Sequence, residues 1–88
     1  MNVNFKSRFA KDLQKIANAN ILNQIKTIIE QVEQAQNLQD IKNLKKLKIG
    51  NIYYRIRVGS YRIGLLIEDE IVTFVRCLNR RDFYKYFP

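Results

Sequence analysis

The sequence predicts an α+β fold, in which an antiparallel β-meander packs against helices. Apolar residues recur at helical spacing in the first half of the chain, and from Ile52 onward they alternate with polar residues. The period changes at Gly50-Asn51, a pair of residues that interrupts helices. With 88 residues, of which 47% are hydrophobic, we expect a single domain over residues 1–88.

The first half predicts one short strand and two helices. Val3 and Phe5 alternate with polar neighbours, which is typical of a strand. Ser7 is a favourable N-cap for a helix over residues 8–18. After the polar break Asn18-Ala19-Asn20, a second helix follows, and the short connection favours an antiparallel helical hairpin. The apolar stripe of the second helix is expected to contain Ile21, Ile25, Ile28, Ile29 and Val32.

The segment between the second helix and the meander is polar and rich in lysine. Asp40 is expected to cap one further helical turn that carries Ile41 and Leu44. The nearby lysines are expected to form the solvated face of that turn. They are Lys42, Lys45, Lys46 and Lys48.

Period-two alternation predicts three strands, over residues 52–58, 61–67 and 71–78. Gly59-Ser60 is expected to form a type II′ turn between the first two strands, because that turn favours glycine at its first position. Glu68-Asp69-Glu70 is expected to form the second turn.

The remaining segment, Asn79 to Phe87, is short and charged and predicts a helical turn or two. We expect Phe83, Tyr86 and Phe87 to form its apolar side. Tyr84 follows Arg80 by four residues and would share its helical face.

Composition excludes several kinds of chemistry. The sequence has no histidine, so a Ser-His-Asp triad, a histidine-pair ribonuclease and a histidine-rich zinc site are impossible. Its single cysteine, Cys77, cannot close an internal disulfide and is expected to be an inert buried thiol, which suits a reducing cytoplasm. No apolar run approaches the roughly 20 residues of a membrane span. No apolar signal-peptide region follows Met1.

The charge is strongly positive and the arginines are concentrated in the meander and tail. The formal net charge of +8 favours a polyanion or an acidic protein as partner. The Gly59-Ser60 turn places Arg57 opposite Arg62, with no carboxylate in either strand to relieve their repulsion. It also places Arg55 opposite Gly64, which leaves a hollow that another backbone or a ligand could approach.

Guanidinium groups match phosphate bidentately, so we interpret this arginine face as an anion-binding surface. For any one of these arginines a solvated surface position is the alternative. The opposite face of the hairpin is expected to pack on the helices, through Tyr54, Ile56, Val58, Tyr61, Ile63 and Leu65.

Two motifs carry a resemblance to a known family. They are Tyr54-Arg55-Ile56-Arg57-Val58-Gly59-Ser60-Tyr61-Arg62-Ile63 and Asn79-Arg80-Arg81-Asp82-Phe83-Tyr84. Both resemble the RelE/ParE toxin superfamily of bacterial type II toxin–antitoxin systems, and the order of elements resembles that family over the whole chain. The RelE branch implies a metal-independent endoribonuclease without a cofactor, which cleaves mRNA in the ribosomal A site and represses translation. It further implies a cytoplasmic protein whose partners are the ribosome and a cognate antitoxin, with no membrane partner.

The resemblance also implies roles for individual residues. Arg62, Arg80 and Tyr84 match the catalytic positions of the family. Arg62 would stabilise the phosphorane, Arg80 would neutralise the leaving oxygen, and Tyr84 would act as general base or stacking group. Substrate binding falls to Arg55, Arg57, Asn79 and Arg81. Many relatives have histidine where this chain has Asn79, and asparagine can form hydrogen bonds but cannot titrate near neutral pH.

Two other functions remain open. One is a ParE-like inhibitor of DNA gyrase, which shares the fold and lacks the nuclease residues. The retained arginines and Tyr84 oppose this alternative, whereas Asn79 leaves it open. The other is a basic RNA-binding module without catalysis.

Overall fold

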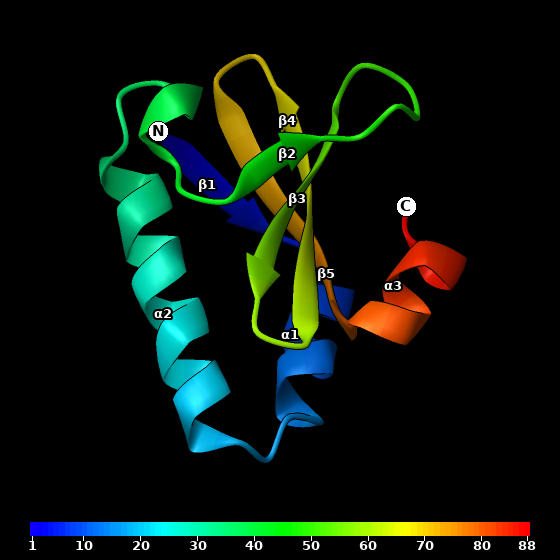
Figure 1. Cartoon of the computed structure of the whole chain (residues 1–88). Coiled ribbons are helices and arrows are strands. Elements are labelled where there is room, and N and C mark those ends of the chain that lie inside the picture. The colour runs from blue at the N-terminus through cyan, green and yellow to red at the C-terminus, as the bar shows by residue number, and fades with distance from the viewer.

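The computed structural model describes residues 1–88 as a five-stranded sheet with helices on both faces (Figure 1). The strand order is β1-β5-β4-β3-β2, with β1 parallel to β5 and all other neighbours antiparallel. The predicted α+β class is therefore confirmed. In chain order the elements are β1 (Asn2–Phe5), α1 (Ser7–Gln14), α2 (Ala19–Gln34), the 3₁₀ turn η1 (Leu38–Asp40), β2 (Leu44–Lys46), β3 (Tyr53–Val58), β4 (Tyr61–Glu68), β5 (Ile71–Asn79) and α3 (Arg80–Tyr86).

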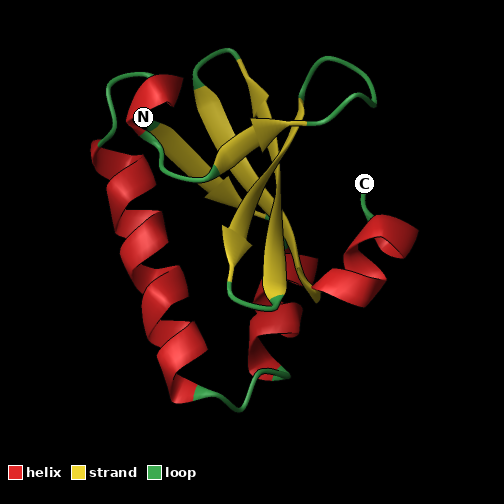
Figure 2. Ribbon diagram, in the orientation of Figure 1, coloured by secondary structure: helices red, strands yellow, loops and turns green.

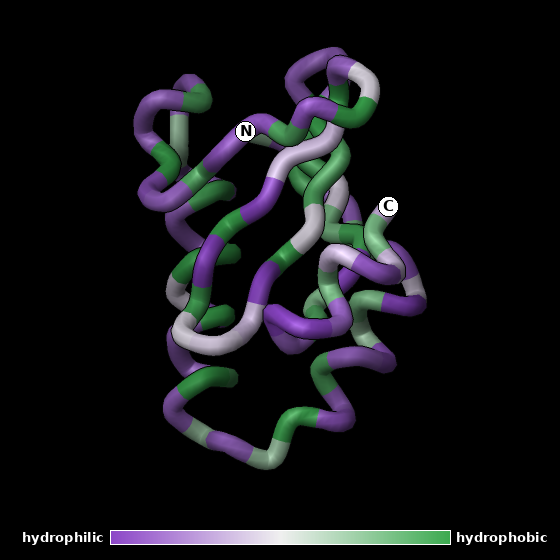
Figure 3. Tube along the Cα trace, turned by 45° about the vertical axis from the view of Figure 1, so that its right-hand side comes forward, coloured by the Kyte–Doolittle hydropathy of each residue, from purple (hydrophilic) through white to green (hydrophobic).

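The hydrophobic core lies between the sheet and the pair α1 and α2, while α3 lies on the other side of the sheet (Figure 2). Helix α1 packs on β5, and α2 contacts β1 and β3. The expected stripe of α2 is confirmed, since Ile25 and Val32 are buried in the core and its other members pack against it. Polar and apolar residues accordingly alternate along the coil of this helix (Figure 3).

Both helix starts depend on single residues. Lys6, and not Ser7 as expected, is the N-cap of α1, and the helix ends at Gln14 rather than at residue 18. The N–H groups of Lys15 and Ile16 donate to carbonyls three residues back, which tightens the last turn and ends the helix. Asn18 caps α2 as a side-chain acceptor for two backbone N–H groups, at 2.9 and 3.2 Å.

The predicted helical turn after Asp40 is wrong, because this segment adds a strand to the sheet. Asp40 does not cap a following helix but is the last residue of η1, and its Oδ2 accepts the Gln36 N–H at 3.1 Å. The chain then pairs with the outer edge of β3 as β2, which places Lys45 opposite Arg55. Pairing satisfies edge groups of β3 that would otherwise face solvent, and this tertiary gain overrides the local helical pattern.

The predicted register of the β3–β4 hairpin is confirmed. Arg57 lies opposite Arg62 and Arg55 opposite Gly64. Gly59 has a φ of 55°, and Ser60 is not in the left-handed region, as a type II′ turn requires.

The β4–β5 turn is shorter than predicted. Glu68 belongs to β4, and the turn consists of Asp69 and Glu70 alone. Their φ angles of 53° and 64° place two non-glycine residues in the left-handed region, as a type I′ turn demands. Both residues therefore carry backbone strain.

Strand β5 changes its pairing part of the way along. The parallel pairing with β1 ends at Phe74, although the Lys6 N–H still donates to the Phe74 carbonyl at 2.9 Å. The register against β4 then shifts, since Leu65 pairs with Phe74 and Gly64 with Arg76. Beyond Val75 the strand has only one neighbour in the sheet.

The strained turn yields a stability prediction. Replacing Glu70 by glycine removes the steric cost of its positive φ, so Glu70→Gly should stabilise the fold by about 0.5–1 kcal/mol, net of the entropy that glycine adds to the unfolded chain. Urea unfolding monitored by circular dichroism measures this change. Glu70→Gln is the control for the lost charge and should leave stability nearly unchanged. Equal stabilisation by both variants would assign the effect to charge instead.

Candidate functional site

The tip of the β3–β4 hairpin and the start of α3 form an open hollow of about 590 Å³. The Arg80 backbone N–H donates to the Ser60 carbonyl oxygen at 2.7 Å, and this bond joins the two elements. The hollow contains two arginines and no carboxylate, so it suits an anion. The lining residues are Ser60, Asn79, Arg80, Arg81 and Tyr84. Four of the predicted site residues thus meet here, and Ser60 is an addition that the sequence did not indicate.

Asn79 sets the direction in which α3 leaves the sheet. It is the N-cap of that helix, and its Oδ1 accepts the Arg81 N–H at 3.0 Å. The helix then presents Arg80 and Tyr84, four residues apart, to the same hollow. Tyr84 is 61% exposed, and its ring meets Phe83 edge-on at 5.1 Å. An exposed ring beside guanidinium groups is available both for stacking and for proton transfer.

Two phenylalanines anchor α3 to the sheet. Phe83 and Phe87 are buried and stack with their ring centroids 4.9 Å apart. A Cβ on Gly64 would overlap the Phe87 ring, so Phe87 lies directly over this glycine. The prediction of a hollow beside Arg55 is therefore wrong, because the Phe87 side chain fills the space above Gly64.

Tyr86 does not join this apolar contact, contrary to expectation. It is as exposed as Tyr84, at 61%. The buried stripe of so short a helix holds only the pair four residues apart, Phe83 and Phe87, and a residue at position 86 points away from it.

Arg62 is buried beneath the hairpin turn. Only 6% of its surface is exposed, and its Nη1 donates to the carbonyls of Gly59 and Tyr61, both at 2.9 Å. These carbonyl dipoles offset the positive charge that faces Arg57 across the hairpin. Arg62 thereby braces the turn that carries Ser60, and its Nε and Nη2 make no hydrogen bond within the chain.

The other predicted binding residues lie outside the hollow. Arg55 is half-buried on β3, opposite Lys45 of β2, so the structure adds a lysine to this basic row. Arg57 is exposed and borders a separate shallow hollow of about 320 Å³ against α2. Lys45 could not be recognised in advance because its strand was not predicted.

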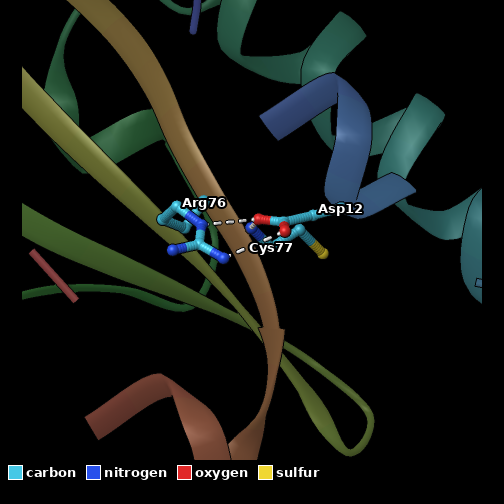
Figure 4. A network of polar contacts seen from close by, with 3 residues as sticks. All are labelled: Asp12, Arg76 and Cys77. Atoms are coloured by element: carbon cyan, nitrogen blue, oxygen red, sulfur yellow. Dashed lines mark hydrogen bonds and ion pairs between the residues drawn. The ribbon is translucent and has the colours of Figure 1, made fainter. Parts of the chain in front are cut away.

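A buried polar cluster holds β5 to α1 (Figure 4). Asp12 is 6% exposed and binds the Arg76 side chain through two contacts, Nε to Oδ2 at 2.8 Å and Nη2 to Oδ1 at 3.1 Å. Oδ2 also accepts the backbone N–H of Cys77 at 2.9 Å. Sequence reasoning missed Asp12, although its spacing from Phe9 and Ile16 placed a carboxylate on the apolar stripe of α1.

The pKa values of Arg76 and Cys77 are both raised in this cluster. The hydrogen bond that Arg76 donates to Asp12 raises the pKa of Arg76, while burial of the guanidinium acts in the opposite direction. Burial, and secondarily the Asp12 charge, raises the pKa of Cys77 to about 12. The expected burial of the Cys77 thiol is confirmed, and the raised pKa keeps it protonated at neutral pH.

Two negative findings complete the description of the chain. Nowhere do three or more carboxylate or cysteine side chains converge as a metal site would require. None of the helices combines the length and the apolar character needed to traverse a bilayer.

Comparison with known proteins points to one family. The family model that matches is described as the ParE toxin of type II toxin–antitoxin system, parDE, and it covers residues 3–84. Toxin RelE3 of Methanocaldococcus jannaschii is 43% identical to this chain over 89 residues, which is 100% of both proteins.

Solved structures share the fold. The crystal structure of the RelB-RelE antitoxin-toxin complex from Methanococcus jannaschii matches with a TM-score of 0.82 and 40% identity, covering 97% of this chain and 99% of that one. The archaeal RelE-RelB complex from Pyrococcus horikoshii OT3 matches with a TM-score of 0.72 over 90% and 93% of the two chains. At 18% identity, the second similarity concerns the fold alone.

The contact between Gly64 and Phe87 yields a prediction about how α3 is anchored. Gly64→Ala should destabilise the fold by about 1–3 kcal/mol, because the new methyl group displaces the Phe87 ring. In a Phe87→Ala background the same substitution should cost almost nothing. Denaturant unfolding of the four proteins of this double-mutant cycle measures the coupling. A Gly64→Ala cost that is equal in both backgrounds would show that another contact is responsible.

Proposed function

The chain belongs to the RelE/ParE superfamily of type II toxins, and from this premise we propose that it is a ribosome-dependent mRNA endoribonuclease. The supporting observation is the hollow at the start of α3, where Arg80, Arg81 and Tyr84 gather without a carboxylate. Such a set can bind a phosphate and supply a proton acceptor without a metal or histidine. Cleavage of mRNA would repress translation in the cytoplasm.

In the proposed reaction the 2′-hydroxyl of the mRNA attacks the adjacent phosphorus in line, and the bond to the 5′-oxygen breaks. If Tyr84 acts as general base, it does so as the phenolate, which accepts the 2′-hydroxyl proton and becomes the phenol. Arg80 neutralises the charge on the leaving 5′-oxygen, which takes a proton from solvent water to become a hydroxyl. Arg62 is nearly buried beneath the adjoining turn and does not line the hollow, so in this proposal it stabilises the phosphorane through its positive charge. The products are a 2′,3′-cyclic phosphate and a 5′-hydroxyl end, and DNA, which lacks the 2′-hydroxyl, is not cut.

The remaining basic residues bind substrate in this proposal. Asn79 and Arg81 hold the reacting nucleotide within the hollow. Arg55 and Arg57 bind flanking phosphates on the outer part of the sheet, where Lys45 can join them. Phosphate binding by several cations releases counterions, so affinity for the ribosome should fall steeply with salt.

The proposed protein partner is a cognate antitoxin. Both archaeal relatives described above were crystallised as RelB and RelE together. The net charge of +8 favours an antitoxin with an acidic segment.

Two exposed tyrosines on α3 allow a matched test of this function. Tyr84 lines the hollow and Tyr86 does not, yet both are 61% exposed. After inducible expression, the 5′-ends of ribosome-bound mRNA are mapped by sequencing. Wild type and Tyr86→Phe should give equal numbers of new 5′-hydroxyl ends in the A site, whereas Tyr84→Phe should give about 10²-fold fewer if the phenol is the general base. If Tyr84→Phe cuts normally and Tyr84→Ala does not, the ring acts by stacking.

A second candidate, inhibition of DNA gyrase, is favoured by the matching family model, whose description names ParE. Growth arrest with intact mRNA and a DNA-damage response that survives Tyr84→Phe would identify this activity. Neither arrest nor new ends from a folded protein that binds RNA would instead indicate a non-catalytic RNA-binding module.

A further inference from the structure

The last part of β5 requires an anchor that the sheet does not supply. Strand β1 accompanies β5 only from Ile71 to Phe74, and β4 is the sole strand beside residues 76–79. On the side that β1 leaves open, the N–H of Cys77 would lack a partner. A buried N–H without an acceptor is strongly unfavourable, so this point of the fold needs an acceptor from another element.

Asp12 of α1 fills that place. Its Oδ2 accepts the Cys77 N–H at 2.9 Å, as a carbonyl of a longer β1 would. The same carboxylate takes both contacts from Arg76, the preceding residue, so two successive residues of β5 are held from one helix (Figure 4). Asp12 is almost completely buried and the Arg76 side chain is 14% exposed, so the carboxylate that accepts these hydrogen bonds is largely shielded from water.

The candidate site begins directly after this anchor. Two residues beyond Cys77, Asn79 caps α3, and the next residue, Arg80, donates its N–H to Ser60. Asn79 also borders a smaller hollow of about 240 Å³, which Asp12 and Arg76 line as well. Asn79 thus lines both the hollow with Tyr84 and the smaller hollow beside Asp12.

We propose that Asp12 is a positioning residue of the functional site, which fixes the end of β5 and through it the placement of Arg80, Arg81 and Tyr84. Its carboxylate touches none of the residues that line the hollow with Tyr84 and acts only through Arg76 and Cys77. The catalytic consequence rests on the proposed function. The structural consequence, selective loosening of α3, does not.

Amide hydrogen exchange of the purified full-length protein tests the structural part. Asp12→Asn removes the charge and the paired acceptor, and should speed exchange of the Arg80 and Arg81 amides at least tenfold. Core amides at Leu65 and Val72 should change by less than twofold, because local opening spares the core. Arg76→Lys keeps both the positive charge beside Asp12 and the Cys77 N–H bond, and should change exchange of the Arg80 amide less than threefold.

The control is Leu22→Ala, which truncates a half-buried side chain of α2 that belongs neither to the Asp12 cluster nor to the lining of the hollow with Tyr84. A merely structural loss of stability speeds exchange of the most protected amides together, as Leu22→Ala should. If Asp12→Asn gives that uniform pattern, or leaves Arg80 and Arg81 protected as in wild type, the proposal is wrong. Should Asp12→Asn fail to fold, Arg76→Gln provides the same test, with selective loosening again expected and uniform loosening again contradicting it.

Cleavage on ribosomes then tests the catalytic part. Asp12→Asn shifts the side chains that line the hollow but removes none of them, so it should lower kcat about tenfold and change KM less than twofold. Leu22→Ala should change neither constant at a temperature where it is folded. Selective exchange with unchanged kcat would overturn the catalytic role of Asp12. Selective exchange in a protein whose wild type does not cut mRNA would refute the proposed function and leave the positioning of α3 intact.

Discussion

The carboxylate of Asp12 is the interaction on which the functional end of this fold depends. Strand β1 is too short to accompany β5 to its end, and a helix side chain replaces it at Cys77. A buried carboxylate is costly to desolvate, and here two guanidinium nitrogens and one backbone N–H offset that cost. Removing one partner would leave the other buried polar groups without a hydrogen-bond partner, which is unfavourable. The direction of β5, and therefore of α3, follows from this contact.

The second constraint is the way α3 is attached. The helix has only seven residues and lies on the sheet face opposite the main core, so it needs a specific contact. Phe87 supplies it by packing over Gly64, the position in β4 where no side chain stands in the way, and Phe83 stacks on the Phe87 ring. Gly64, which suggested a ligand site, therefore provides the space in which Phe87 packs. The predicted basic site residues other than Arg62 lie in two groups. Arg80 and Arg81 lie at the start of α3, and Arg55 and Arg57 lie on β3, where Lys45 of β2 is opposite Arg55.

Local rules predicted the parts of the fold that depend on neighbours in sequence. Gly59 adopts the positive φ of its turn, and the hairpin register follows from that turn. The polar break that begins at Asn18 separates the two helices as predicted, and the Asn18 side chain caps α2. The largest error lies where a distant contact decides, because the lysine-rich segment joined the free edge of β3. Two smaller errors have local causes. Helix α1 ends early in a tightened last turn, and Tyr86 lies outside the buried pair of the short α3.

The sequence by itself determined the fold class, the hairpin with its opposed arginines, the absence of histidine chemistry and the membership of Asn79, Arg80, Arg81 and Tyr84 in one short motif. These properties follow from composition and from spacing along the chain. Only the tertiary structure decided that Phe87 fills the space above Gly64, that Arg62 braces a turn, that Lys45 stands beside Arg55 and that Asp12 holds β5. Each of these joins residues through packing or a hydrogen bond whose geometry exists only once the sheet has formed, because sequence periodicity records which face a residue occupies and not what meets it there.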